Sequence, residues 1–150
     1  MSATRPIRQV PKPSPWARHA AAVLQAARLG DQAATVAAAK ALLAAHGSGV
    51  IPQVMVAWID TLIGARGITE VGQPARIMFA DTDTGAIGDV TQVRPEVAWA
   101  GRLINARIAD DEESFRALMG AVPEGKSDRY VTTLLDCCAQ SINLAIGRPR

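Results

Sequence analysis

The chain has 150 residues, 49% of them apolar and only 4% aromatic, and its formal net charge at pH 7 is +2. Its length favours one domain with a core that needs no metal or disulfide, and its apolar content excludes an intrinsically disordered chain. Alanine dominates the apolar residues, which favours helices because alanine loses no side-chain entropy in forming one.

Residues 1–13 carry three prolines and scattered positive charges, and they predict a flexible, basic, Pro-rich arm. No acidic residue precedes Asp31. Arg5, Arg8, Lys12 and Arg18 are therefore candidate contacts for phosphate groups or for a partner. A solvated tail and a targeting segment are the alternative interpretations.

Two helices are predicted next, joined by the short turn "LGD". Ser14 and Pro15 suit the start of the first helix, which runs through Leu29 until Gly30 ends it. Asp31 caps the second helix, which continues to about residue 45.

A third helix begins near Pro52 and is closed by Gly64 and Gly67. Its apolar stripe recurs at helical spacing and consists of Ile51, Met55, Trp58 and Leu62. The run "VIPQVMVAWIDTLI" is shorter than the roughly 18 residues that a membrane span needs. We interpret it as a buried core helix and expect no membrane partner.

The character of the sequence changes over residues 67–94, where "RIMFA" and "AIGDVTQV" predict two strands of a β-hairpin. Between them lies Asp81-x-Asp83-x-Gly85. A phosphatase of the haloacid dehalogenase type would need a large α/β sheet behind such a motif. A calcium loop would need a side-chain oxygen ligand where Gly85 stands and a bidentate Glu where Gln92 stands. We therefore interpret the motif as turn chemistry.

Helices are predicted again at residues 95–109, 110–121 and 127–146. Pro95 starts the first of them, and Ser127 caps the last. The four carboxylates at 110–113 are interpreted as a solvated helix start that complements the helix dipole, with magnesium binding as the alternative. The predicted fold is thus mainly α: a single domain over 14–150 with two three-helix units (14–66 and 95–147), joined by a central β-hairpin.

The two helical halves resemble each other. Residues 26–38 can be laid on residues 105–117, which pairs Asp31 with Asp110. An internal duplication is one interpretation. Chance is the other, because alanine matches are frequent in a chain so rich in alanine.

Candidate chemistry is sparse. Cys137 and Cys138 are neighbours that point about 100° apart on a helix, so they are poorly placed to bridge. His19 and His46 have no partner at a diagnostic spacing and receive no role. The sequence predicts no catalytic residue, metal or cofactor, and its cysteine usage fits a reduced, cytoplasmic setting.

The three tryptophans are the largest apolar side chains. Trp58 lies on the stripe of the third helix and is predicted to be core. Trp16 and Trp99 stand near helix starts and are candidate anchors for a protein partner.

The predicted function is a non-enzymatic protein–protein interaction or assembly module, homodimeric through pairing of its hairpin with that of a second copy. The alternative is an accessory nucleic-acid-binding protein that uses the basic arm together with Arg148 and Arg150. A small enzyme with a metal held by Asp81 and Asp83, or by residues 110–113, is a third hypothesis.

Overall fold

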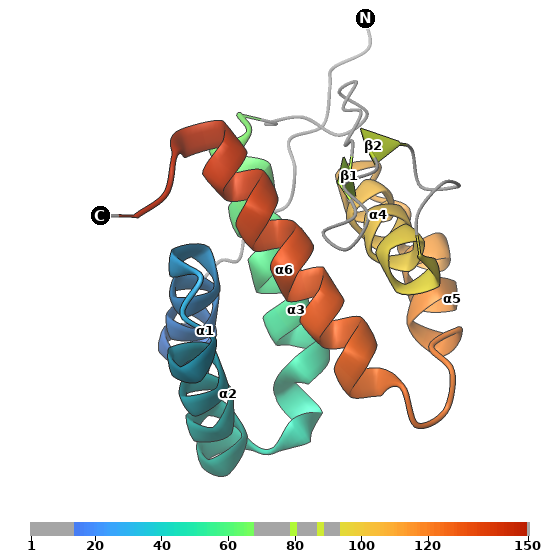
Figure 1. Cartoon of the computed structure of the whole chain (residues 1–150). Helices are drawn as coiled ribbons and strands as arrows, with labels where there is room; N and C mark the ends of the chain where they lie inside the picture. The colour runs from blue at the N-terminus through green and yellow to red at the C-terminus, as the bar shows by residue number, and fades with distance from the viewer. Residues whose placement is uncertain (1–13, 68–78, 81–86, 89–93, 150) are drawn as a thin grey trace, which may run out of the picture. The chain divides into compact units, whose positions relative to one another are not determined.

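The computed structural model describes residues 14–67, 79–80, 87–88 and 94–149. The predicted arm with Arg5, Arg8 and Lys12, and the motif with Asp81 and Asp83, lie outside the described residues. The described residues form helices for most of their length (Figure 1). The helices are α1 (Ala17–Leu29), α2 (Gln32–His46), the 3₁₀ turn η1 (Ser48–Val50), α3 (Ile51–Ala65), α4 (Pro95–Ile108), α5 (Glu112–Gly120) and α6 (Ser127–Ile146).

The chain divides into two compact units, and helix α6 contributes to both. Unit 1 contains α4, α5 and α6 through Cys137, whereas unit 2 contains α1, α2, η1, α3 and α6 from Cys138 onwards. The prediction of one trio in each half of the chain is therefore wrong for the last helix. α6 is 20 residues long, and it has buried side chains on both sides of this division, from Tyr130 to Ile142.

Local signals place three helix ends of unit 2 as predicted, but not the start of α1, which begins at Ala17 with no side-chain cap rather than at the predicted Ser14. Gly30 ends α1 in the left-handed conformation, with φ 72°, which glycine adopts without a steric penalty. The Asp31 carboxylate caps α2 by accepting a hydrogen bond from the amide of Ala34 at 3.0 Å. Pro52 lies in the first turn of α3, where its missing N–H costs nothing.

Helix α3 supplies much of the core of unit 2. Trp58 is buried and donates from its indole Nε1 to the carbonyl of Ala20 in α1, at 3.0 Å, which confirms its predicted place in the core. The window Ser48–Ala65 has the length and composition of a membrane span, although a core helix passes the same test and a third of the window is buried. The buried side chains of α3 are Val54, Met55, Trp58, Ile59, Leu62 and Ile63.

Helix α4 is the most deeply buried element of unit 1. Ten of its 14 residues are buried, and Trp99 donates from Nε1 to the carbonyl of Leu118 in α5 at 2.7 Å. The Trp99 ring also packs edge-on against Tyr130 of α6, with 5.3 Å between ring centroids. Trp99 thus joins the three helical segments of this unit.

The central β-hairpin of the predicted fold is not supported. The described residues of that region pair only Phe79–Ala80 (β1) with Ile87–Gly88 (β2), antiparallel and two residues each. Two strands alone are marginal in water because they lack a sufficient hydrophobic face. The fold is mainly α, which confirms that part of the prediction.

The turns of the α1–α2 and α4–α5 hairpins share one backbone pattern. Their equivalent residues, however, differ by one position from the alignment predicted from sequence. Asp110 has φ 55° and corresponds to Gly30, so Asp111, rather than Asp110, is the counterpart of Asp31. The amide of Asp31 donates to Ala26 O, and that of Asp111 donates to Ala106 O. Each residue of the α1–α2 turn therefore has its equivalent in the α4–α5 turn 80 positions later in the chain.

Candidate functional site

The exposed face of α2 is the most unusual surface of unit 2. Of the 15 residues in this helix, only Leu42 is buried, and Lys40 is its only Lys, Arg, Asp or Glu. Four exposed alanines follow one another at a spacing of four residues and form a ridge along the helix. This alanine ridge consists of Ala33, Ala37, Ala41 and Ala45.

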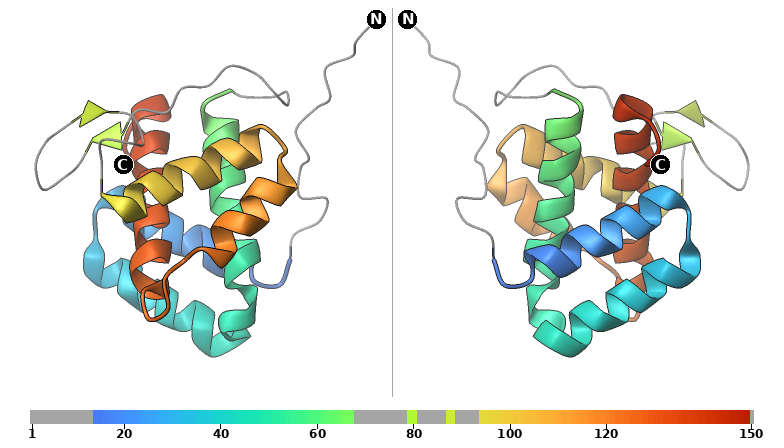
Figure 2. Two further views of the ribbon diagram at one scale, coloured as in Figure 1. Left: turned by 90° about the vertical axis from the view of Figure 1, so that its right-hand side faces the viewer. Right: turned by 90° about the vertical axis from the view of Figure 1, so that its left-hand side faces the viewer.

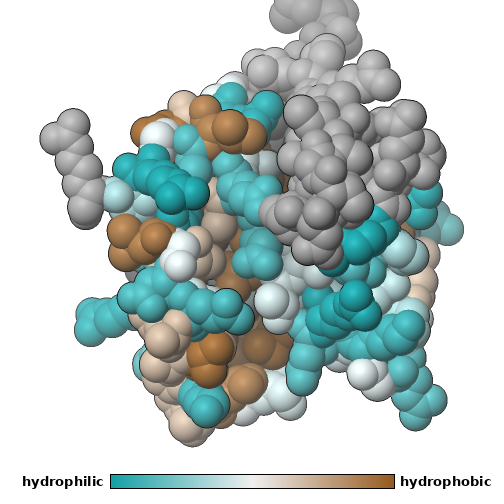
Figure 3. Space-filling model, in the orientation of Figure 1, coloured by the Kyte–Doolittle hydropathy of each residue, from teal (hydrophilic) through white to brown (hydrophobic). Residues whose placement is uncertain are grey.

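Larger apolar side chains are exposed on other parts of α2 and elsewhere in the same unit. Val36 is 46% exposed and Leu43 is 43% exposed, and both lie on α2. In Figure 3, tan and brown atoms gather at the lower left, over α2. Every large hydrophobic residue that is exposed within the described residues belongs to unit 2; they are Leu29, Val36, Leu43, Leu144 and Ile146.

Helix α5 of unit 1 provides a comparison within the same chain. The turn before it has the same backbone pattern as the turn before α2. None of its residues is buried, whereas α2 has one buried residue. Its exposed positions include Glu112, Glu113 and Arg116, and charged side chains are well solvated. Exposure alone therefore does not explain the apolar surface of α2.

A clasp of three hydrogen bonds holds the ends of α1 and α6 together. Arg28 donates from Nε to Asn143 Oδ1 and from Nη2 to Gly147 O, each at 3.0 Å. The Asn143 side-chain amide donates back to Arg28 O at 3.0 Å. Leu29 and Leu144, each next in sequence to a clasp residue, thus lie at the same end of unit 2, and Arg28 is occupied within the fold.

His19 of α1 and His46, the last residue of α2, meet at the open end of their hairpin (Figure 2 shows the two helices side by side). His46 Nε2 lies 3.2 Å from His19 Nδ1, and the rings are edge-on with centroids 5.0 Å apart. Both side chains are half-buried. One ring donates an N–H and the other accepts it, which links the two helices far from the Gly30 turn.

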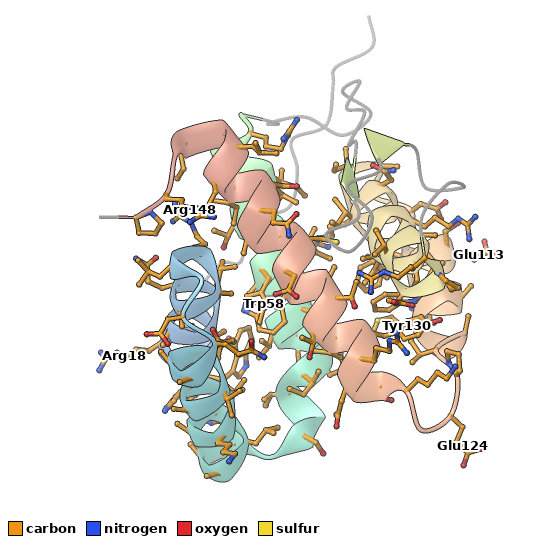
Figure 4. All side chains as sticks on the ribbon, viewed as in Figure 1. Arg18, Trp58, Glu113, Glu124, Tyr130 and Arg148 are labelled. Atoms are coloured by element: carbon orange, nitrogen blue, oxygen red, sulfur yellow. The ribbon has the colours of Figure 1, made fainter. Side chains whose placement is uncertain are left out.

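The predicted contact residues fall in different settings. Arg18 is exposed and points away from α1 into solvent (Figure 4). Trp16 is half-buried, just before α1. Trp99 is 5% exposed and occupied by the bond to Leu118, so its indole presents almost no surface to a partner. Arg148 is exposed near the end of the chain.

The acidic run at 110–113 includes a helix cap. Asp111 accepts from the Ser114 amide at 3.0 Å and from the Ser114 hydroxyl at 2.6 Å. These bonds, the hydroxyl first, hold the pKa of Asp111 below its usual value. Glu112 and Glu113 lie in the first turn of α5, where negative charge complements the helix dipole.

The two cysteines are free and buried. Burial, followed by the charge of Asp136, raises the pKa of Cys137 to about 12, although Arg94 opposes the shift. Partial desolvation likewise raises the pKa of Asp136. Because the thiolate is the reactive form, Cys137 is poorly suited to nucleophilic chemistry.

A buried carboxylate lies at the start of α4. Glu96 Oε1 is 3.6 Å from Arg94 Nε and 3.6 Å from Arg129 Nε, and the Glu96 side chain is only 7% exposed. Buried charge is retained only where it is paired, so this trio ties the first turn of α4 to the first turn of α6. It is a structural ion cluster within unit 1.

No three His, Cys, Asp or Glu side chains gather into a metal-binding group anywhere in the described ranges. Comparisons with protein-family models, with curated proteins and with solved structures find no match for this chain. The candidate sites therefore follow from the geometry of the chain itself.

Sequence reasoning missed both the α2 face and the histidine pair. A count of charges helix by helix would have detected the first, since α2 has one and the shorter α5 has three. The second was detectable from the tight "LGD" turn. A helical hairpin brings the start of its first helix close to the end of its second, and that is where His19 and His46 stand.

Proposed function

We propose that the protein is a non-enzymatic assembly module, and that its exposed α2 face docks against the same face of a second copy. The observation that carries the proposal is the contrast between two exposed helices. The outer surface of α2 carries alanine, valine and leucine with one lysine, whereas that of α5 carries three charged side chains.

The alanine ridge suits close approach of helices. Small side chains shorten the distance between helix axes, and ridges spaced by four residues pack into the grooves of a facing helix. Val36 and Leu43 are exposed on another side of α2, about 100–120° around the helix axis from Ala37, so the seam itself consists mainly of alanine. The gain is roughly 25 cal/mol for each Å² of apolar surface removed from water.

A second copy is the occupant that best fits the charge pattern. A twofold interface brings the same patch of both chains together. A strongly charged patch would repel its own copy, whereas the α2 face has only Lys40. Lys40 can keep its ammonium group in water while its methylene stem covers apolar surface.

A matched pair of substitutions tests the proposal. Ala37 and Ala117 occupy equivalent exposed positions in the α1–α2 and α4–α5 hairpins. By size-exclusion chromatography with light scattering at tens of micromolar, we expect the wild-type protein to have twice the mass of one chain. Ala37→Glu should lower the mass to that of a monomer, because it places a charge in the seam. Ala117→Glu costs the same helix propensity and should leave the dimer intact.

Two results would contradict this function. One is a wild-type chain that is monomeric under these conditions. The other is a dimer that withstands Ala37→Glu as well as it withstands Ala117→Glu.

A further inference from the structure

The ring nitrogens of His19 and His46 that face each other are also potential metal ligands. A neutral imidazole nitrogen that lacks a hydrogen is both a hydrogen-bond acceptor and a metal ligand. The pair presents one nitrogen from each of two helices, 3.2 Å apart. The structure thus brings together two potential donor atoms that are 27 positions apart in sequence.

The separation of these nitrogens matches that of two ligands on one metal ion. Zn²⁺ binds imidazole nitrogen at about 2.0–2.1 Å with tetrahedral geometry, which places two such ligands about 3.3 Å apart. The observed 3.2 Å between His46 Nε2 and His19 Nδ1 is close to that value. Chelation would require rotation of the rings rather than movement of α1 or α2.

The surroundings of the pair define the class of ion. Both histidines are half-buried rather than enclosed, so an ion can reach them from solvent. Imidazole suits Zn²⁺, Ni²⁺ and Cu²⁺, whereas Mg²⁺ and Ca²⁺ prefer oxygen ligands. Because the described residues supply no group of three metal-binding side chains, water would complete the coordination.

We propose that His19 and His46 form a two-histidine chelating site for a divalent transition-metal ion of the zinc class. The lone pairs of His19 Nδ1 and His46 Nε2 bind the ion. The N–H hydrogen that joined them moves to the other nitrogen of its own ring, so both rings stay neutral and no proton is released.

A bound ion would fasten the open end of the α1–α2 hairpin, opposite the Gly30 turn. The pair is preformed only in the folded chain, so binding favours the folded state. The site would act on the helix that carries the proposed docking face, but metal binding does not depend on that function. Each proposal can fail without the other.

Thermal unfolding of the full chain with and without Zn²⁺ tests the site. At a free Zn²⁺ concentration one hundred times the dissociation constant, the melting temperature of the wild-type protein should rise by about 5–10 °C. Mg²⁺ at the same concentration should leave it unchanged. In His19→Gln and His46→Gln, the rise with Zn²⁺ should disappear, because a single imidazole cannot chelate.

The comparison is made within each protein, with and without metal, so a variant that is less stable still gives a valid result. If either variant fails to fold, the wild-type protein provides a second measurement. Paramagnetic Ni²⁺ should broaden the ring proton signals of both His19 and His46 in its NMR spectrum. A wild-type melting temperature indifferent to Zn²⁺, an equal rise in both variants, or broadening confined to one ring would overturn the proposal.

Discussion

The α1–α2 and α4–α5 hairpins share a turn and a buried pattern but differ in what they present to water. Ala20, Val23, Leu24 and Ala26 of α1 are buried. The residues 80 positions later are buried too, and they are Ala100, Leu103, Ile104 and Ala106 of α4. On the second helix of each hairpin the likeness ends, because α5 has a charged exposed surface and α2 an apolar one.

This difference separates what a hairpin needs to fold from what it can offer a partner. The shared turn and buried face account for folding in both cases. The apolar surface of α2 contributes nothing to the interior of its unit, since only Leu42 is buried there. Packing within the unit therefore gives no reason for the apolar side chains on the surface of α2.

Equivalent core truncations should produce the largest effects. Leu24→Ala and Ile104→Ala each leave a cavity and should lower the free energy of unfolding by about 2–5 kcal/mol. Ile104 is 0% exposed and Leu24 is 5% exposed, so the loss should be greater at Ile104. Urea unfolding followed by circular dichroism measures both. A loss below about 1 kcal/mol at either site would break the equivalence of the two buried faces.

The glycine of the α1–α2 turn should come next. Gly30 has φ 72°, and no atom lies within 4 Å of the place that a methyl group would take there, so Gly30→Ala adds backbone strain without a clash. It should cost about 1–2 kcal/mol. Gly64→Ala in α3 is the control, because Gly64 has helical backbone and open space. The control should stabilise the chain by up to about 1 kcal/mol. If Gly30→Ala and Gly64→Ala changed the free energy of unfolding in urea in the same direction, backbone strain at Gly30 would be excluded as the cause.

The two helix caps should give the smallest effects. Asp31→Ala removes the bond to the Ala34 amide and should cost about 1 kcal/mol. Asp111→Ala should also destabilise, and in a pH-dependent way. The Ser114 hydroxyl lowers the pKa of Asp111 from 3.8, so its stabilising effect is present above pH 3.8 and is lost as the pH falls through the folded-state pKa.

Thermal unfolding of the wild type and Asp111→Ala between pH 2 and 6 tests this dependence. The gap between their melting temperatures should be widest at pH 6 and should narrow as the pH falls toward 2. A gap that stays constant down to pH 2 would show that the cap acts through packing rather than through its charge.

The sequence by itself determined the helical class, most helix ends and much of the core. Gly30, Asp31 and Pro52 act on the backbone next to them, so their effects are readable without the rest of the fold. Trp58 lies on an apolar stripe whose period is local as well. The β-hairpin prediction was wrong because alternation in "RIMFA" and "AIGDVTQV" indicates strand propensity, whereas a sheet needs a hydrophobic face to bury.

Only the tertiary structure decided which residues from distant segments meet. It divided α6 between two units, enclosed Trp99 against Leu118 and Tyr130, and brought His19 to within hydrogen-bonding distance of His46. It also revealed which face of α2 stays exposed. These outcomes depend on packing between helices, which is set by many side chains at once and has no signal at any single position.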